Sequence, residues 1–490
     1  MNEKYFLPPP PKYRFTDLLK YIYNAYTFNP FISIPLFIRD SINSINSIVF
    51  FVIIIYLLSL TSYPTPENLL RLFRKNSNLV IILILISLLI YVSIYSLASS
   101  YYWCMLIPVS IKIFREEDSS TSDMLDGIKN VRKIFRAIFT VNLVIALIPA
   151  SILLFLLKYL LNFANISSIL FLITLSIIAF IIYLILNFFS IYVPYIAYFY
   201  NLNPFKCISE SIRLVVKTFL DLIVYIVIRI TAISIIGIVV FLFELISISI
   251  SNMIAFIFSA IIIPIIDIAL FGIFYQQISY IVPFRRKKSL KAIFSKYFKK
   301  GLIELKKFII DLNSYPYILL SILILILSIY LGLWIANTYL HSIIGYIIKK
   351  GRINPIFSKY FPFSIATEIF FNNWKVSITS SVGGIATPIP PIAIETLNGI
   401  ILGIIFSNIS IKEFTILIMP HGIIELPCFL ISIAMGIRLG IIFFLNRERL
   451  SNELRRAVLL SIGLSPLFFI AALVEAYITP FLARNILGWS

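Results

Sequence analysis

Residues 223–243 read IVYIVIRITAISIIGIVVFLF, an apolar run of helical length that contains one charged residue, Arg229. At 1.5 Å per residue, an α-helix of about 20 residues spans the hydrocarbon core of a bilayer. Hydrocarbon offers no partners for backbone amides, so only helices or closed barrels can cross it, and barrel strands are shorter and alternate in polarity. The stretch therefore predicts a transmembrane helix.

The composition extends this expectation to the whole chain. Of its 490 residues, 60% are hydrophobic and 13% are charged, and the mean hydropathy of +0.99 lies outside the range of soluble globular proteins. We predict an all-α fold, a polytopic transmembrane helix bundle of about eleven spans with amphipathic helices in the cytoplasmic interface. The predicted spans are residues 44–60, 79–107, 138–160, 167–199, 219–243, 252–279, 316–337, 365–385, 392–408, 413–444 and 457–482.

Basic residues predict the domain organisation and the orientation. Residues 284–312 are rich in lysine and are expected to form a basic cytoplasmic linker or interfacial helix between a six-span domain, residues 1–283, and a five-span domain, residues 313–490. The segments on the side of the N-terminus carry about three times as many lysines and arginines as the opposite segments, which is typical of cytoplasmic loops. We expect a multi-pass protein of the plasma membrane, with a cytoplasmic N-terminus and its C-terminus outside.

The formal net charge of +19 does not predict nucleic-acid binding, because most cations lie where the positive-inside rule places them. The block from Arg285 to Lys300 is expected to contact anionic lipid headgroups, at about 1 kcal/mol per cation. Basic amphipathic segments recur at 127–147, 207–227 and 289–310, a pattern typical of helices that lie in the membrane interface.

Charged side chains at the centre of a span cost about 2.5–3.5 kcal/mol each, so they usually face protein or water. In the first block, Arg229 and Asp267 lie on neighbouring predicted spans, and we expect a structural ion pair between them. The six spans with surface helices resemble membrane domains of uncharacterised prokaryotic families, including one attached to some glycerophosphodiester phosphodiesterases. That resemblance concerns architecture and implies no activity.

The stretch PHGIIELP, residues 420–427, contains two prolines inside a predicted span. Pro427 lacks an amide proton and clashes with the carbonyl four residues before it, so a helix through it should break or kink near residue 423. Pro420 suits a helix start, which predicts half-helices at 413–419 and 421–444 with a hinge between them. The predicted positions of helix breaks or hinges are Pro420, Gly422, Pro427, Thr479 and Pro480.

Ionisable and polar side chains concentrate in the spans of the second block. At i and i+4, His421 and Glu425 would share one helix face. Arg438 lies about 20 Å further along the axis, so its anion has to come from another span, with Glu475 and Glu395 as the candidates. The predicted intramembrane polar network comprises His421, Glu425, Glu475, Arg438, Glu395 and Asn398. Glycine pairs at i and i+4 predict close helix packing at Gly399, Gly403, Gly436 and Gly440.

Five motifs follow one another in the second block. They are FFNNWKVSITSSVGG (370–384), ETLNGIILG (395–403), PHGIIELPCF (420–429), GIRLG (436–440) and VEAYITP (474–480). In this order they resemble the stage II sporulation protein M family, over about residues 316–482. The resemblance implies a five-span membrane domain and, from the role linked to the family in sporulating bacteria, assembly of peptidoglycan-degrading partners during engulfment. The six-span block in front and the turn at 386–391 depart from the family's pattern.

Three kinds of function fit these features. We expect a non-enzymatic scaffold that assembles or anchors unidentified protein partners, and self-association of the chain is an open alternative. A channel, carrier or conduit for ions or lipids is the second reading, because broken helices with carboxylates form such sites. An intramembrane metal-dependent enzyme ranks third, since HxxxE offers two zinc ligands but the chain has no HExxH motif or nucleophile elbow. No metal site or cofactor is predicted.

Overall fold

In a computed structural model of the protein, all regular structure of the described residues is helical. The structure describes residues 24–59, 77–162, 166–244, 248–279, 290–340 and 362–488, together with Leu18, Tyr21 and Ile281. The first residues of the basic block, from Arg285 to Ser289, lie outside this part.

Nine helical stretches of the described residues are long and apolar enough to cross a membrane. Their positions match nine of the eleven predicted spans, and the other two coincide with helices of 32 and 22 residues, α7 (Val131–Asn162) and α16 (Pro362–Gly383). Helix α16 is less apolar because it carries Glu368 and Lys375, and α7 begins with Arg132 and Lys133 ahead of its apolar part. The all-α, multi-pass membrane fold is confirmed, and the count of eleven stays a prediction.

The helices group into two compact units. The first unit comprises residues 1–36, 95–238 and 258–294, and the second comprises residues 37–94, 239–257 and 295–490. The longest segment of the second unit, residues 295–490, begins inside the predicted linker at 284–312. The unit also includes two segments of the predicted six-span domain, residues 37–94 and 239–257. The reason is packing within this unit, where the Phe256 ring lies 6.2 Å from Phe37 and 6.0 Å from Phe371, and the Asn252 side chain donates to Glu368.

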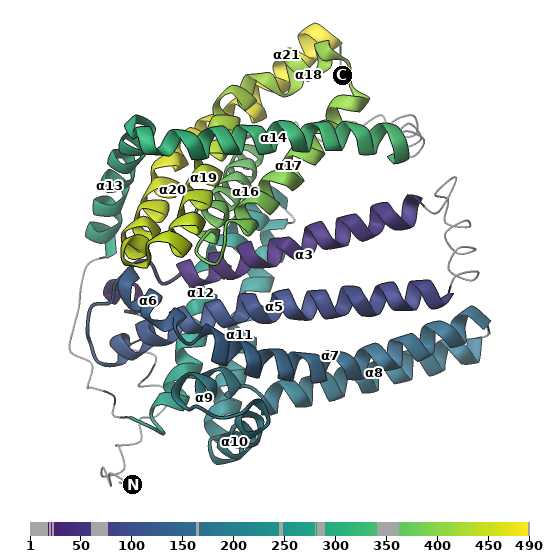
Figure 1. The fold of residues 1–490 in the computed structure, drawn as a ribbon, viewed down its shortest axis with the longest axis vertical. Helices are drawn as coiled ribbons and strands as arrows, with labels where there is room; N and C mark the ends of the chain where they lie inside the picture. The colour runs from purple at the N-terminus through teal and green to yellow at the C-terminus, as the bar shows by residue number, and fades with distance from the viewer. Residues whose placement is uncertain are drawn as a thin grey trace. The chain divides into compact units, whose positions relative to one another are not determined.

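The first unit contains a long hairpin, short surface helices and an aromatic core. Tyr195 is packed between Phe271 and Phe274, with ring centroids 5.4 and 5.2 Å away. In Figure 1, α7 and α8 lie side by side as the hairpin. The helices that lie wholly or largely in this unit are α2 (Ala25–Phe28), α5 (Ser77–Phe114), α6 (Thr121–Ile128), α7, α8 (Ile166–Phe189), α9 (Val193–Phe199), α10 (Pro204–Lys217), α11 (Phe219–Glu244) and α12 (Ile248–Tyr275).

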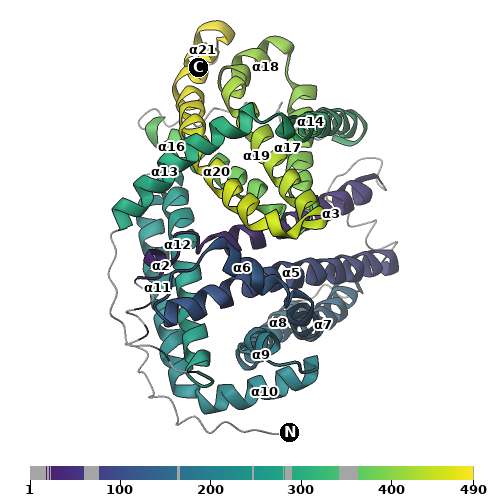
Figure 2. The same ribbon diagram turned by 60° about the vertical axis from the view of Figure 1, so that its left-hand side comes forward.

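The second unit is a bundle with a surface helix at one end and a helix pair at the other. Figures 1 and 2 show α13 meeting the start of α14 and the pair α18 and α21 at the far end. Its helices are most of α3 (Ile34–Ser59), α13 (Leu290–Ile310), α14 (Tyr315–Ile335), α16, α17 (Ile389–Asn408), α18 (Ile411–Leu417), α19 (Met419–Leu445), α20 (Leu450–Leu473) and α21 (Thr479–Leu487), with π-helical turns at Ala336–Leu340 and Val474–Ile478 and 3₁₀ turns at Leu312–Ser314 and Arg447–Arg449.

Glycines set the helix spacing in this bundle. A Cβ atom on Gly436 of α19 would overlap the carbonyl oxygen of Ser380 on α16, and one on Gly403 of α17 would overlap that of Ile329 on α14. Gly399 faces Ser328 of α14 in the same way, and Gly440 faces the Thr387–Pro388 peptide at the turn before α17. All four glycines singled out in the sequence therefore lie where backbones approach each other closely, which a side chain would prevent.

Two of the basic amphipathic segments form separate surface helices. In α10, the Asn203 side chain accepts a hydrogen bond from the amide of Lys206, so the helix starts with a cap followed by proline. In α13, Gly301, Leu305 and Phe308 are buried, while lysines and apolar side chains alternate over the exposed side. This distribution is typical of a helix between lipid and water.

Candidate functional site

The helix that carries PHGIIELP starts at a break. Helix α18 ends at Leu417, Ile418 separates it from α19, and Pro420 occupies the first turn of α19. The predicted half-helices thus exist, with the hinge at Ile418. Of the expected break or kink near residue 423, the break is wrong, because α19 continues through Gly422 and Pro427 to Leu445, and a kink stays a prediction. Pro427 leaves the Ile423 carbonyl without its helical amide donor, and the Ile423 side chain is 65% exposed.

A second irregularity follows α20. Residues Val474–Ile478 form a π-helical turn, and Pro480 lies in the first turn of α21. The Thr479 backbone amide donates to the Val474 carbonyl five residues before it, which is the π-helical pattern, and the Thr479 hydroxyl donates to the same oxygen at 3.5 Å. Pro480 has no amide proton, so it cannot donate to the Ala476 carbonyl four residues before it. Turns of this kind are frequent at functional sites. Glu475 lies within this one.

These two irregular segments bring His421, Glu425 and Glu475 together. One potential ligand atom from each lies within 4.8 Å of the other two, and the imidazole Nε2 of His421 is 3.9 Å from a carboxylate oxygen of Glu475. The histidine is buried, Glu425 is partly buried, and the Glu475 side chain is 33% exposed. The cluster can hold a proton or a divalent cation, because it combines two carboxylates with one imidazole.

Glu395 of α17 lies apart from this cluster. It is almost fully buried, and one carboxyl oxygen accepts a hydrogen bond of 2.7 Å from the Ser321 hydroxyl of α14. Asn398 follows it by nearly one turn and is half-buried on the same helix. Glu395 belongs to the α14–α17 contact, so the predicted single network divides into separate groups.

Arg438 forms the third group, at the opposite end of α19. Its guanidinium donates to Asp311 at 3.0 Å, to the Ser314 hydroxyl at 3.0 Å and to Glu453 at 3.3 Å. The expected partners Glu475 and Glu395 are therefore wrong. A long arginine side chain can reach charges near a membrane interface, and such charges are cheaper to place there than at the centre of a span.

The Arg438 group extends to the surface helix. Arg456 donates to Glu304 of α13 at 2.5 Å and to Glu453 at 2.9 Å. The hydrogen bond from Arg438 holds the pKa of Asp311 below its usual value. We name this group the charge network: Glu304, Asp311, Arg438, Glu453 and Arg456.

Sequence reasoning missed three acidic members of the charge network and Arg456. Glu304, Asp311 and Glu453 lie in segments assigned to cytoplasmic loops, where a charge needs no partner. The usable signal was Arg438 itself, which required an anion within reach, and the nearest acidic residues beyond its own span belong to the adjoining loops. The network also places the segments before α14 and before α20 on one side of the bundle.

In the first unit, the predicted direct ion pair between Arg229 and Asp267 is replaced by tyrosine contacts. Arg229 donates to the Tyr225 hydroxyl at 3.1 Å, and Asp267 accepts a hydrogen bond from the Tyr102 hydroxyl. Phenol groups can bridge between charges at some distance because they both donate and accept.

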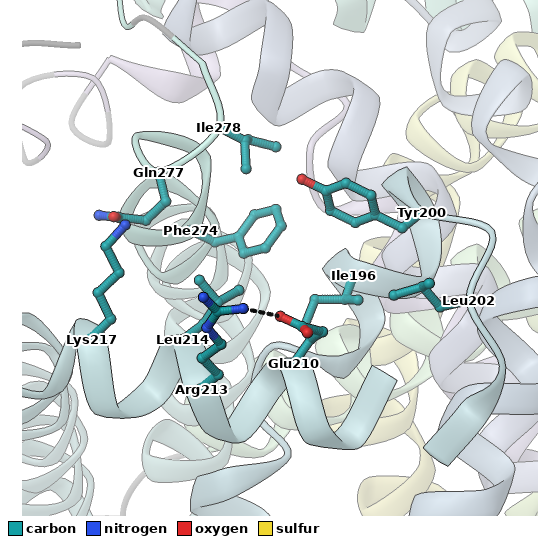
Figure 3. Close-up of a pocket in the computed structure, with 10 residues that line it drawn as sticks. All are labelled: Ile196, Tyr200, Leu202, Glu210, Arg213, Leu214, Lys217, Phe274, Gln277 and Ile278. Carbon is teal, nitrogen blue, oxygen red and sulfur yellow. Dashed lines mark ion pairs between the residues drawn. The ribbon is translucent and has the colours of Figure 1, made fainter. Parts of the chain in front are cut away.

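The first unit also holds a pocket of about 410 Å³ between α9, α10 and the end of α12. Figure 3 shows Phe274 and Tyr200 at its wall, Lys217 beside Gln277, and the ion pair between Arg213 and Glu210, which measures 3.9 Å. The Arg213 side chain is 82% exposed. The pocket is an open amphipathic surface hollow, and the lysine and arginine make it suited to an anionic headgroup.

A family model described as stage II sporulation protein M matches residues 321–480, which contain the clustered histidine and glutamates. The uncharacterized protein MJ0793 of Methanocaldococcus jannaschii is 30% identical over 131 residues, which cover 24% of this chain and 74% of the relative.

The chain belongs to the stage II sporulation protein M family. The family region is the C-terminal third, from α14 to the first residues of α21, and it includes His421, Glu425, Glu475, Glu395 and Arg438. No solved structure matches the chain.

Proposed function

We propose that this member of the stage II sporulation protein M family is a non-enzymatic scaffold that assembles or anchors protein partners at the membrane. The observation that carries the proposal is the attachment of α13 to the family region. Gly301 packs against the backbone of Leu459 and Gly463 on α20, and Arg456 binds Glu304. A basic surface helix is thereby fixed to a bundle whose helices are themselves in backbone contact.

The exposed side of α13 is the proposed docking surface. It presents cations together with apolar side chains, among which Ile303 is 56% exposed and Ile310 is 64% exposed. Such a surface suits a partner with an acidic face, while the lysines toward its start suit anionic lipid headgroups. The proposed docking surface consists of Lys299, Leu302, Ile303, Lys306, Lys307 and Ile310.

The test is affinity purification of the full chain from native membranes in mild detergent, with identification of co-purified proteins. Replacing Lys299, Lys306 and Lys307 by glutamine should reduce partner recovery at least fivefold, because the charge attraction is removed while the buried side of α13 is untouched. The matched control neutralises three exposed cations of the first unit, Lys129, Arg132 and Lys133, and should leave recovery unchanged. Recovery that is equal for both triple variants would refute the docking surface.

We further propose that the N-terminus and α13 face the cytoplasm and the C-terminus faces outward. The excess of lysine and arginine on one side supports this orientation. Single cysteines at Lys307 and at Arg484, in a chain whose native cysteines are replaced, test it with a membrane-impermeant maleimide on intact cells. We expect labelling at position 484 alone. Labelling at position 307 without permeabilisation would show that the orientation is the reverse of the one proposed.

A conduit is the second candidate, favoured by one observation. Glu475 is a third exposed while Glu425 is partly buried beside it, so the carboxylates of the cluster differ in their access to the outside of the bundle. Carboxylates at helix irregularities are used for ion and proton transfer in transporters.

A further inference from the structure

We propose that His421, Glu425 and Glu475 bind one divalent transition-metal ion of the zinc class, which ties the start of α19 to the π-helical turn after α20. The proposal is independent of the scaffold function. It concerns what occupies the cluster, whereas the docking surface lies on α13.

The first argument is the state of the histidine. His421 is only 9% exposed, yet its Nδ1 atom has no hydrogen-bond partner, and its Nε2 atom is 3.9 Å from Glu475, beyond hydrogen-bond distance. A buried polar atom without a partner carries a desolvation cost that no hydrogen bond offsets. A metal ion bound to an imidazole nitrogen removes that cost for the coordinating atom.

The second argument is charge balance. Within the described residues, neither Glu425 nor Glu475 forms an ion pair with lysine or arginine, and one buried oxygen of Glu425 has no partner. The acidic residues of the charge network differ in this respect, because each of them contacts an arginine. Two carboxylates and a neutral imidazole around a divalent ion form a neutral group, which is the form that costs least inside a membrane.

The third argument is geometry and ligand type. Imidazole with carboxylate suits zinc and neighbouring first-row metals, and three protein ligands leave a position for water. Ligand atoms about 2.1 Å from a tetrahedral ion lie about 3.4 Å apart, so atoms now within 4.8 Å of one another need to approach by up to about 1.4 Å. Rotation of the two glutamate side chains can supply that movement, since neither is fully buried.

The experiment uses the full chain in mild detergent, with an affinity tag that contains no histidine. The protein is stripped with a chelator, mixed with Zn²⁺, desalted and analysed for metal by mass spectrometry. We expect one equivalent of Zn²⁺ in the wild type and less than one fifth of an equivalent in His421→Ala, Glu425→Gln and Glu475→Gln. Two controls should keep one equivalent: His341→Ala, which removes the other histidine of the chain, and Glu395→Gln, which alters a buried carboxyl outside the cluster.

A second measurement separates loss of binding from loss of folding. Zn²⁺ should raise the thermal unfolding midpoint of the wild type and of Glu395→Gln but not that of Glu425→Gln, because an ion that binds only the folded state stabilises it. Folded wild type that retains no zinc after desalting, or zinc content that His421→Ala leaves unchanged, would overturn the proposal.

Discussion

Replacing Arg438 by methionine is expected to destabilise the protein by about 3–5 kcal/mol, the usual cost of removing one partner from a buried ion pair. The Arg438 side chain is 10% exposed and contacts both Asp311 and Glu453. Its loss removes the closest cation of Asp311 and one of the two arginines that bind Glu453. The measurement is the thermal unfolding midpoint in detergent, followed by intrinsic fluorescence and circular dichroism.

The exposed Arg449→Ala is the matched control and should change stability by less than about 0.5 kcal/mol. A triple variant, Arg438→Met with Asp311→Asn and Glu453→Gln, should recover most of the loss, because the uncompensated charges are removed together with their partner. A midpoint of Arg438→Met equal to that of Arg449→Ala would show that the charge network does not stabilise the bundle.

Gly436→Ala is the second substitution with a large expected effect, a loss of at least about 3 kcal/mol, at the upper end for overpacked interiors. The added Cβ would overlap the Ser380 carbonyl, and a backbone atom in a packed helix cannot move aside as a flexible side chain can. The yield of monodisperse protein and its unfolding midpoint are the measurements.

Gly237→Ala is the matched control, because a Cβ at that helical position meets nothing within 4 Å. It should be neutral or stabilising by up to about 1 kcal/mol, from the better helix propensity of alanine. If the two alanine variants unfold at the same midpoint, α16 and α19 are not held together by backbone contact.

The membrane fold could be predicted because a long apolar run inside a bilayer has almost no alternative to forming a helix. On α11, side chains such as Val227, Ile233 and Ile238 are more than half exposed, as expected for a helix whose solvent is lipid. The pairing of His421 with Glu425 was equally accessible, since helical periodicity alone places residues i and i+4 on one face.

The partners of Arg438 and the grouping of the helices into two units could not be predicted from the sequence in this way. A search limited to spans omitted Asp311 and Glu453, which lie beside span ends, and the reach of arginine decides such pairs. The packing of α3 and the start of α12 with the C-terminal helices depends on tertiary contacts such as that of Phe256 with Phe371, which chain order does not encode.

The break at Ile418 shows how packing selects among local options. Both Pro420 and Pro427 could have ended a helix, and the chain starts α19 at the first and continues through the second. Starting a helix at proline costs little, because the missing amide would have no intrahelical partner there, whereas the internal proline leaves the Ile423 carbonyl without its amide donor.

As a scaffold, the family region with α13 attached should behave as one rigid platform, whereas a carrier alternates between states. Pulsed electron–electron double resonance tests this rigidity most directly. Spin labels are placed at Lys307 on α13 and Lys412 on α18, which are both exposed, in a chain whose buried Cys104, Cys207 and Cys428 are replaced. In proteoliposomes, the account predicts a single narrow distance distribution that ion and pH gradients leave unchanged. Two distances whose proportions shift with a gradient would contradict the scaffold and favour the conduit.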